Sequence, residues 1–231
     1  MKPTDLKYPF KWEERRPELH QKVLFVPHFY QNHELWKFPG WEDPALFGKK
    51  GKVILEYCSG NGSWVIQKAL KEPHAHWIAI EKKFDRVRKI WSKLQKLSLN
   101  NLLVVCGEAL TFTRYYLPPN TVDEIYINFP DPWPKLKHAK HRLIQSPFVE
   151  ELLRILKQGG KAVFVTDHED YSKQIVREML LSKQWKSCFA PPYYATSWEN
   201  YGTSYFDDLW RKKGKTIHYH QFENVKEGYA Y

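Results

Sequence analysis

The stretch VILEYCSGNGS, residues 53–63, contains the local pattern that decides the fold class. Residues 53–55 are large and apolar, which favours a buried strand. Gly60 and Gly62 follow in the turn, where the absence of a Cβ lets the backbone come close to a ligand. Residues 63–70 then have the apolar spacing of a helix. A strand, a glycine turn and a helix in this order are typical of the first unit of a parallel α/β sheet.

The same alternation continues along most of the chain. Further strands are expected at residues 76–80, 102–105, 122–127 and 161–166, and helices at residues 84–97, 147–156 and 171–182. A sixth strand is expected within residues 185–194, and residues 216–222 would form a last, antiparallel strand. This spacing predicts a doubly wound, mostly parallel sheet of the α/β class. Residues 1–45 lack clear periodicity and hold six prolines. We therefore expect a partly irregular N-terminal extension before a domain over residues 46–231.

The composition indicates an anionic partner. The net charge is +10, which favours nucleic acid, and 16% of the residues are aromatic, some of which could stack on bases. The three cysteines have no CxxC spacing, so neither a disulfide framework nor a zinc site is expected. The chain has no apolar run of 18 residues and no signal-peptide pattern, so a cytoplasmic protein is expected.

A proline-rich loop follows the strand expected at residues 122–127. Residues 128–134 are NFPDPWP, and the next eight, KLKHAKHR, form a basic segment. Each proline fixes its own φ and lacks an N–H, so the loop is stiff. It presents an amide, a carboxylate and an indole at the carboxyl end of a strand, where open α/β sheets bind ligands. Proline turns and solvated basic runs are common separately, but together at a strand end they favour chemistry on a base within a polyanion.

Carboxylates at the strand ends suggest a nucleoside site. Glu81 ends the second strand, where an acidic residue commonly holds ribose hydroxyls, and Glu108 follows the third strand, where it could meet an adenine edge. The simpler alternatives are a solvated carboxylate for Glu81 and a helix cap for Glu108. The turn lacks the third glycine of a dinucleotide fingerprint, and no phosphate-binding G-x-x-x-x-G-K-[ST] loop occurs. S-adenosylmethionine, which carries a sulfonium and no phosphate, suits these carboxylates and Glu56.

Three ordered motifs resemble those of the bacterial tRNA (guanine-N7-)-methyltransferases, and the resemblance covers roughly residues 50–222. They are the PDPWPK segment with the basic residues after it, the pair Thr166-Asp167 and the tail at residues 204–217, SYFDDLWRKKGKTI. The chain departs from the usual pattern at four places. Cys58 replaces a glycine, Glu108 replaces Asp or Asn, Leu136 replaces a lysine, and Ser204 with Asp207 replaces Thr-x-[Phe/Tyr]-Glu.

The resemblance implies a class I S-adenosylmethionine-dependent methyltransferase fold, with a seven-stranded sheet whose last strand is antiparallel. It implies transfer of a methyl group from S-adenosyl-L-methionine to N7 of a guanosine in tRNA, at position 46 of the variable loop. The cofactor-binding residues that it implies are Glu56, Gly60, Gly62, Glu81, Glu108 and Asp131, with Asp131 also catalytic. The residues implied at the tRNA are Lys135, Lys137, His138, Lys140, Arg142, Asp167, Ser204 and Asp207. No metal, membrane or protein partner is implied.

The chemistry of this reaction suits the residues. Guanine N7 has an available lone pair, so transfer depends mostly on position and electrostatics, and Asp131 or Asp167 can stabilise a guanine that becomes cationic. Two other functions remain open. An amino-group methyltransferase acting on adenine or protein glutamine would carry [Asn/Asp]-Pro-Pro-[Tyr/Phe/Trp], whereas residues 128–131 are NFPD. A non-catalytic RNA-binding protein on the same fold would not need Glu81 together with Asp131.

Overall fold

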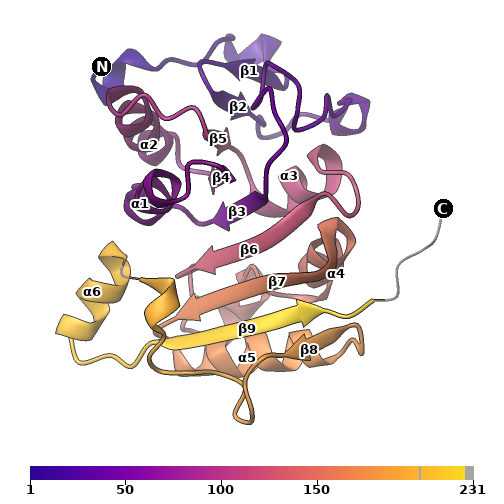
Figure 1. Cartoon of the computed structure of the whole chain (residues 1–231), viewed down its shortest axis with the longest axis vertical. Coiled ribbons are helices and arrows are strands. Elements are labelled where there is room, and N and C mark those ends of the chain that lie inside the picture. The colour runs from indigo at the N-terminus through magenta and orange to yellow at the C-terminus, as the bar shows by residue number, and fades with distance from the viewer. Residues whose placement is uncertain (203, 227–231) are drawn as a thin grey trace. The chain divides into compact units, whose positions relative to one another are not determined.

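The computed structural model describes residues 1–202 and 204–226, and the chain divides into two compact units, Met1–Pro118 and Pro119–Tyr231 (Figure 1). The strands of the first unit are β1 (Glu18–His20), β2 (Val23–Phe25), β3 (Val53–Tyr57), β4 (His76–Glu81) and β5 (Leu102–Cys106). They lie side by side in the order β1-β2-β5-β4-β3. β1 and β2 are antiparallel, and the other pairings within this unit are parallel.

Three α-helices belong to the first unit: α1 (Ser63–Lys71), α2 (Phe84–Lys96) and α3 (Ala109–Tyr116). Short 3-10 helices are η1 (Pro3–Asp5), η2 (Trp12–Glu14) and η3 (His33–Leu35). α1 packs against α2 and β4, and α2 also contacts β5. An apolar stripe on α2 explains this packing, since four of its residues are buried at helical spacing: Val87, Ile90, Trp91 and Leu94.

The N-terminal extension contributes strands to the sheet of the first unit. Residues 23–25 pair in parallel with residues 104–106, and the backbone N–H of Val26 donates to the carbonyl of Cys106 at 2.9 Å. The run Val23 to Val26 is fully apolar, is buried along its length and ends at Pro27. This short apolar run before a proline is a strand signal, although the stretches around it are irregular.

The second unit holds β6 (Val122–Asn128), β7 (Leu156–Thr166), β8 (Trp185–Ser187) and β9 (His218–Asn224), in the order β6-β7-β9-β8. β6 and β7 are parallel, whereas β9 runs antiparallel to both of its neighbours. Its helices are α4 (Ser146–Ile155), α5 (Glu169–Leu180) and α6 (Tyr205–Lys212), with η4 (Leu136–His141) and η5 (Glu199–Tyr201). α5 covers β7, β8 and β9, as Figure 1 shows, and α4 packs against α5 and β7.

The predicted alternation from residue 53 onward is confirmed, with three differences. β7 begins at residue 156 rather than 161, because the chain passes directly from α4 into the strand and Gly159-Gly160 lie within β7. β8 spans only three residues of the range expected for it. α3 and α6 were not predicted. Both begin at a polar N-cap, Glu108 and Ser204, and this cap is the local signal that would have found them.

Among residues 1–202 and 204–226, no helix has the length and apolarity needed to cross a bilayer. The same residues contain no group of three or more His, Cys, Asp or Glu side chains placed to hold a metal ion.

Candidate functional site

In the first unit, Glu81 closes the turn between β3 and α1. Its side chain is 4% exposed, so it is not a solvated carboxylate. Its Oε2 accepts the backbone N–H of Gly60 at 3.0 Å, and its Oε1 accepts that of Lys83 at 2.8 Å. Arg86 lies 3.6 Å from Oε2. An ionised carboxylate has about four acceptor positions, so two N–H bonds leave capacity for ribose hydroxyls.

The turn itself has a left-handed backbone at three residues, Cys58, Gly60 and Gly62, with φ of 61°, 55° and 71°. A Cβ at Gly62 would lie 2.7 Å from Cγ1 of Ile90 on α2, so only glycine fits there. Cys58 carries a side chain in a left-handed conformation that glycine adopts more readily. The turn is otherwise held by Ser59, whose Oγ donates to the carbonyl of Glu56 at 2.9 Å.

The two remaining acidic candidates of this unit have different surroundings. Glu56 is 2% exposed within β3. Glu108 is the N-cap of α3, where its carboxylate accepts the backbone N–H groups of Leu110 and Thr111 at 3.1 and 2.7 Å. The alternative that Glu108 caps a helix is therefore confirmed, and its contact with an adenine edge stays a prediction.

In the second unit, the proline-rich loop continues from the carboxyl end of β6. Asn128 is buried, and its Oδ1 accepts the hydroxyl of Tyr201 at 3.0 Å. The backbone N–H of Phe129 donates to the carbonyl of Val165 on β7 at 2.9 Å. Phe129 and Trp133 have positive φ values, 47° and 43°, and each precedes a proline. Asp131 is exposed between these two residues.

The strand register brings Asp167 to the same edge as this loop. Asn128 of β6 is the register partner of Val165 on β7, so the two parallel strands end side by side. Thr166 is the last residue of β7, and Asp167 follows it directly, before α5. The loop that carries Asp131 and the strand end that carries Asp167 therefore belong to neighbouring strands, where α/β sheets place their ligands.

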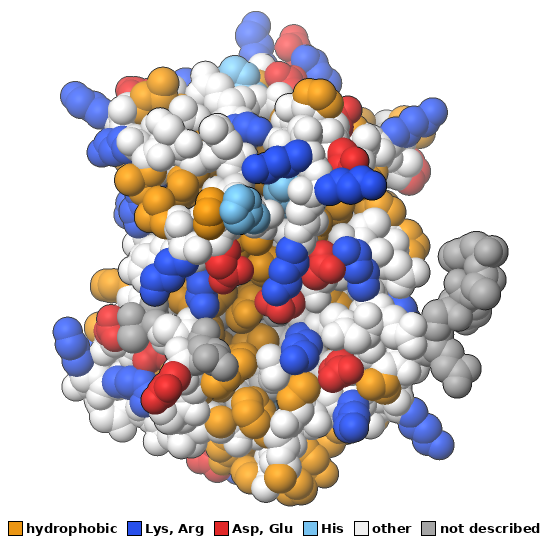
Figure 2. Space-filling model, viewed as in Figure 1, with side chains coloured by type: hydrophobic (Ala, Val, Ile, Leu, Met, Phe, Trp, Pro, Cys, Tyr) orange, Lys and Arg blue, Asp and Glu red, His pale blue; other side chains and the backbone are white. Residues whose placement is uncertain are grey.

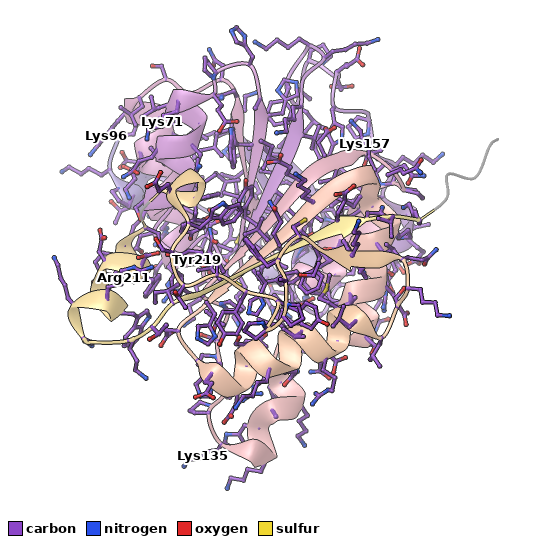
Figure 3. All side chains as sticks on the ribbon, turned by 60° about the horizontal axis from the view of Figure 1, so that its bottom comes forward. Lys71, Lys96, Lys135, Lys157, Arg211 and Tyr219 are labelled. Atoms are coloured by element: carbon purple, nitrogen blue, oxygen red, sulfur yellow. The ribbon has the colours of Figure 1, made fainter. Side chains whose placement is uncertain are left out.

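The basic segment after the loop does not form a uniform surface. Lys135, Lys137 and Lys140 are exposed, and His138 is half-buried with its ring 5.9 Å from that of Trp133. Figure 3 shows Lys135 extending away from the ribbon. Arg142, in contrast, is 5% exposed and bonds inside the unit. Other Lys and Arg side chains are spread over the visible face in Figure 2, with Asp and Glu among them.

The tail motif folds as α6 and binds its own unit. Ser204 is the N-cap of α6, and its Oγ accepts the backbone N–H of Asp207 at 3.1 Å. Asp207 is 2% exposed, and its carboxylate accepts the hydroxyl of Tyr219 on β9 and, at 2.7 Å, Nε of Arg211. Figure 3 shows Arg211 beside Tyr219, and Arg211 also donates to that hydroxyl at 2.9 Å. Burial raises the pKa of Tyr219 to about 12.

The tail and the proline-rich loop, far apart in the sequence, meet in the second unit. Tyr201, which precedes the tail motif, bonds Asn128, and the ring of Phe206 on α6 lies 6.0 Å from that of Phe129. The cofactor candidates Glu56, Gly60, Gly62, Glu81 and Glu108 are likewise gathered in the first unit. Tyr201 was not predicted as a site residue, and Arg142 was predicted to contact tRNA. Their contacts, with Asn128 and with Pro132, depend on segments that meet only in the folded chain.

Comparison with known proteins gives consistent matches. The sequence model of the family described as "Putative methyltransferase" matches residues 50–219. A tRNA (guanine-N(7)-)-methyltransferase of Chlamydia muridarum is 46% identical over 94% of this chain and 95% of its own length. One of Leptospira interrogans is 37% identical over 75% of this chain and 80% of its own length.

A solved structure gives the fold. The S-adenosylmethionine-dependent methyltransferase from Aquifex aeolicus superposes with a TM-score of 0.52, covering 77% of this chain and 84% of its own, at 17% identity. At that identity the likeness concerns the fold, which is the class I methyltransferase fold predicted from the sequence.

Proposed function

Because this chain belongs to the family of tRNA (guanine-N(7)-)-methyltransferases, we propose that it transfers a methyl group from S-adenosylmethionine to N7 of a guanosine in tRNA. The observation that carries the proposal beyond family membership is the edge of the second unit, where the loop after β6 bears Asp131 and the residue after β7 is Asp167. Carboxylates suit a base that becomes cationic as the reaction proceeds.

The residues of the first unit fit the cofactor. Glu81 is buried at the end of β4 with acceptor capacity for ribose hydroxyls, and Gly60 and Gly62 leave the turn without side chains. Glu56 lies near the carboxyl end of β3 and Glu108 follows that of β5, so both add negative charge toward this edge of the sheet. These carboxylate acceptors suit a cationic nucleoside without phosphates, because phosphates would require N–H groups or cations in place of carboxylates.

We assign Asp131 to the guanine. When bound, S-adenosylmethionine supplies a methyl group on a positively charged sulfur, which the lone pair of guanine N7 can accept without prior loss of a proton. Asp131 then has two tasks: its carboxylate accepts hydrogen bonds from N1–H and the amino group, and it stabilises the positive charge that grows on the ring. The stiff loop lets it do so without reorganising.

We assign tRNA binding to the exposed part of the basic segment, with Lys135, Lys137 and Lys140 on phosphates and His138 beside them. Asp167 would complete the edge near the target base, and Ser204 and Asp207 would support it by capping α6 and bonding it to β9. We propose the variable-loop guanosine at position 46 as the target and the cytoplasm as the place of action. We propose that the reaction requires neither a metal ion nor a protein partner.

The decisive experiment uses the full chain, labelled S-adenosylmethionine and unmodified tRNA, followed by nuclease digestion and mass spectrometry of the nucleosides. Methyl on guanine N7 at one site supports the proposal, and sequencing of the digest identifies the position. Methyl on an adenine amino group, or on a glutamine of an added protein, would favour the amino-group alternative. Binding of tRNA with no transfer, although S-adenosylmethionine binds, would favour a non-catalytic RNA-binding protein.

A further inference from the structure

Arg142 belongs to the basic segment by sequence but lies inside the second unit. It is 5% exposed, whereas the three lysines of the segment reach solvent. Its Nε donates to the carbonyl of Pro132 at 2.7 Å, and its Nη1 donates to Oε1 of Gln174 at 2.8 Å. A guanidinium with these contacts is not available for a phosphate in this conformation.

Helix α5 holds the guanidinium in place. Gln174 accepts from Arg142 and also donates through Nε2 to the carbonyl of Ile144 at 2.9 Å. The guanidinium lies 5.1 Å from the ring centre of Tyr171, whose hydroxyl accepts the N–H of Ile144 at 3.1 Å. Tyr171 and Gln174 are both buried. Arg142 is therefore fixed from one side by a rigid helix and, on the other side, bonds the proline-rich loop.

The loop needs such a contact for two physical reasons. Pro130, Pro132 and Pro134 have no N–H, so at these positions the backbone can be held only through its carbonyl groups. In addition, Phe129 and Trp133 have left-handed φ values before prolines, a combination that persists only where the surroundings enforce it. The bonded carbonyl, that of Pro132, directly follows Asp131 in the chain.

The burial of the Arg142 guanidinium has a free-energy cost. Among the described residues, its Nη2 is buried without a hydrogen-bond partner, and a buried charge loses its hydration. A smaller neutral donor could serve one carbonyl, but the fork of arginine reaches the loop and α5 at the same time.

We propose that Arg142 is a positioning residue: it locks the carbonyl of Pro132 and thereby holds Asp131 in place for methyl transfer. This inference rests on the proposed role of Asp131. It replaces, for this one residue, the phosphate contact expected from the sequence, and it assigns Gln174 and Tyr171 of α5 to the same support.

The test uses three variants, Arg142→Met, Arg142→Lys and Gln174→Ala. The control is Arg177→Met, because Arg177 is an exposed arginine on α5, the helix that carries Gln174. Single-turnover methylation at saturating tRNA and cofactor should slow by about 10-fold or more for Arg142→Met and Gln174→Ala, since misplacement of a reacting group costs rate. Arg142→Lys should recover part of the loss. The tRNA affinity and its salt dependence should stay within about twofold. Arg177→Met should change none of these quantities.

A second arm identifies the route. If Arg142 acts through Asp131, adding Arg142→Met to Asp131→Asn should slow transfer much less than it slows the wild type, because the group being held is already gone. A wild-type rate together with a weaker salt dependence in Arg142→Met would instead mean a phosphate contact and would overturn the proposal. Equal slowing in both backgrounds would also overturn it.

Hydrogen exchange separates failure of this inference from failure of the proposed function. The N–H of Phe129 is bonded to Val165, so its exchange rate reports opening of the loop. Faster exchange in Arg142→Met and Gln174→Ala, but not in Arg177→Met, would support the lock even if the wild-type chain methylated no tRNA. Unchanged exchange in folded variants would show that Arg142 does not hold the loop, whatever the methylation rate.

Discussion

At the scale of single residues, Asp131 combines an exposed carboxylate with a backbone that has little freedom. It lies between two prolines, and the residues Phe129 and Trp133 around it have left-handed φ values. Preorganisation of this kind is most useful for a charge that acts only in the transition state, because no rearrangement is then required during the reaction.

We expect Asp131→Asn, which keeps size and removes charge, to slow the chemical step by about 100-fold or more. The binding of tRNA should change less, because the positive charge on the guanine arises only during transfer. The measurement is single-turnover methylation with both substrates saturating. A wild-type rate would move the role to Asp167, because Asp207 is buried and bound to Arg211 and Tyr219.

Glu81 is the second residue whose charge can be tested separately, here for its role in cofactor binding. Glu81→Gln retains an oxygen for the N–H of Gly60 but loses the negative charge that strengthens hydrogen bonds to ribose hydroxyls. We expect S-adenosylmethionine to bind more weakly by about 1–3 kcal/mol, as measured by titration calorimetry. Asp85→Asn, an exposed acid on α2, is the matched control and should bind normally. Equal affinity in folded Glu81→Gln would exclude the ribose role.

At the scale of elements, Lys135 before η4 and Lys137 and Lys140 within it are the exposed lysines of the basic segment. Lys137 and Lys140 are exposed, whereas Arg142 is buried, so two rather than three phosphate contacts are expected from these positions. Lys137→Ala with Lys140→Ala should therefore reduce the log–log slope of tRNA affinity against salt by about 1.4–1.8. Cofactor binding should persist, and Lys71→Ala on α1 serves as an exposed control. An unchanged slope would mean that η4 is a solvated surface only.

The second element-scale feature is the contact between α6 and β9, which is made by Asp207 and Tyr219. Tyr219→Phe would leave the buried carboxylate of Asp207 with one donor fewer. We expect the free energy of unfolding to fall by about 1–3 kcal/mol, measured by urea denaturation. Tyr205→Phe, an exposed tyrosine of α6, should change stability little. If both variants unfolded at the same urea concentration, the Tyr219 hydroxyl would not stabilise the tail.

At the scale of the whole molecule, stability should depend on pH through a buried histidine pair. Nδ1–H of His220 donates to the carbonyl of Tyr193 at 3.0 Å, so Nε2 accepts the hydroxyl of Ser172 at 3.0 Å. The oxygen of Ser172 then accepts Nδ1–H of His218 at 2.7 Å, an assignment inferred from this network. Burial lowers the pKa of His220 to about 4 and also lowers the pKa of His218.

A folded-state pKa below the unfolded value of 6.5 means that the unfolded chain binds the proton first as pH falls. The stabilisation is therefore complete above about pH 6.5 and is lost between about pH 6.5 and 4, by roughly 3–4 kcal/mol at about 1.4 kcal/mol per pKa unit. Urea denaturation from pH 8 to 4 measures this slope. His220→Asn should flatten the slope, while His74→Asn, an exposed histidine, should leave it unchanged. The same slope in both variants would assign the loss to other groups.

Much of the fold could be predicted because its signals are local. Residues 53–63 contain apolar character, glycines and helical spacing within eleven positions, and the same kind of signal located β4, β5, β6 and α5. Some candidate site residues were proposed from local signals, because Glu81, Glu108 and the proline-rich loop follow strands that can be recognised in the sequence. Asp167, Ser204, Asp207 and the catalytic role of Asp131 were proposed from the family resemblance. The short helices α3 and α6 were missed because eight-residue helices carry few turns of periodicity.

The sequence by itself determined the alternation of strands and helices, the stiffness of the proline-rich loop and the residue types at the strand ends. Only the tertiary structure decided that Arg142 faces inward, that Asp207 is held by Arg211 and Tyr219, and that residues 23–25 extend the sheet. The physical reason is that local propensity depends on neighbours in sequence, whereas the partner of a charge depends on which distant segments are packed together. Arg142 lies only two residues after Lys140 in the same basic segment, yet Arg142 is buried and Lys140 is exposed.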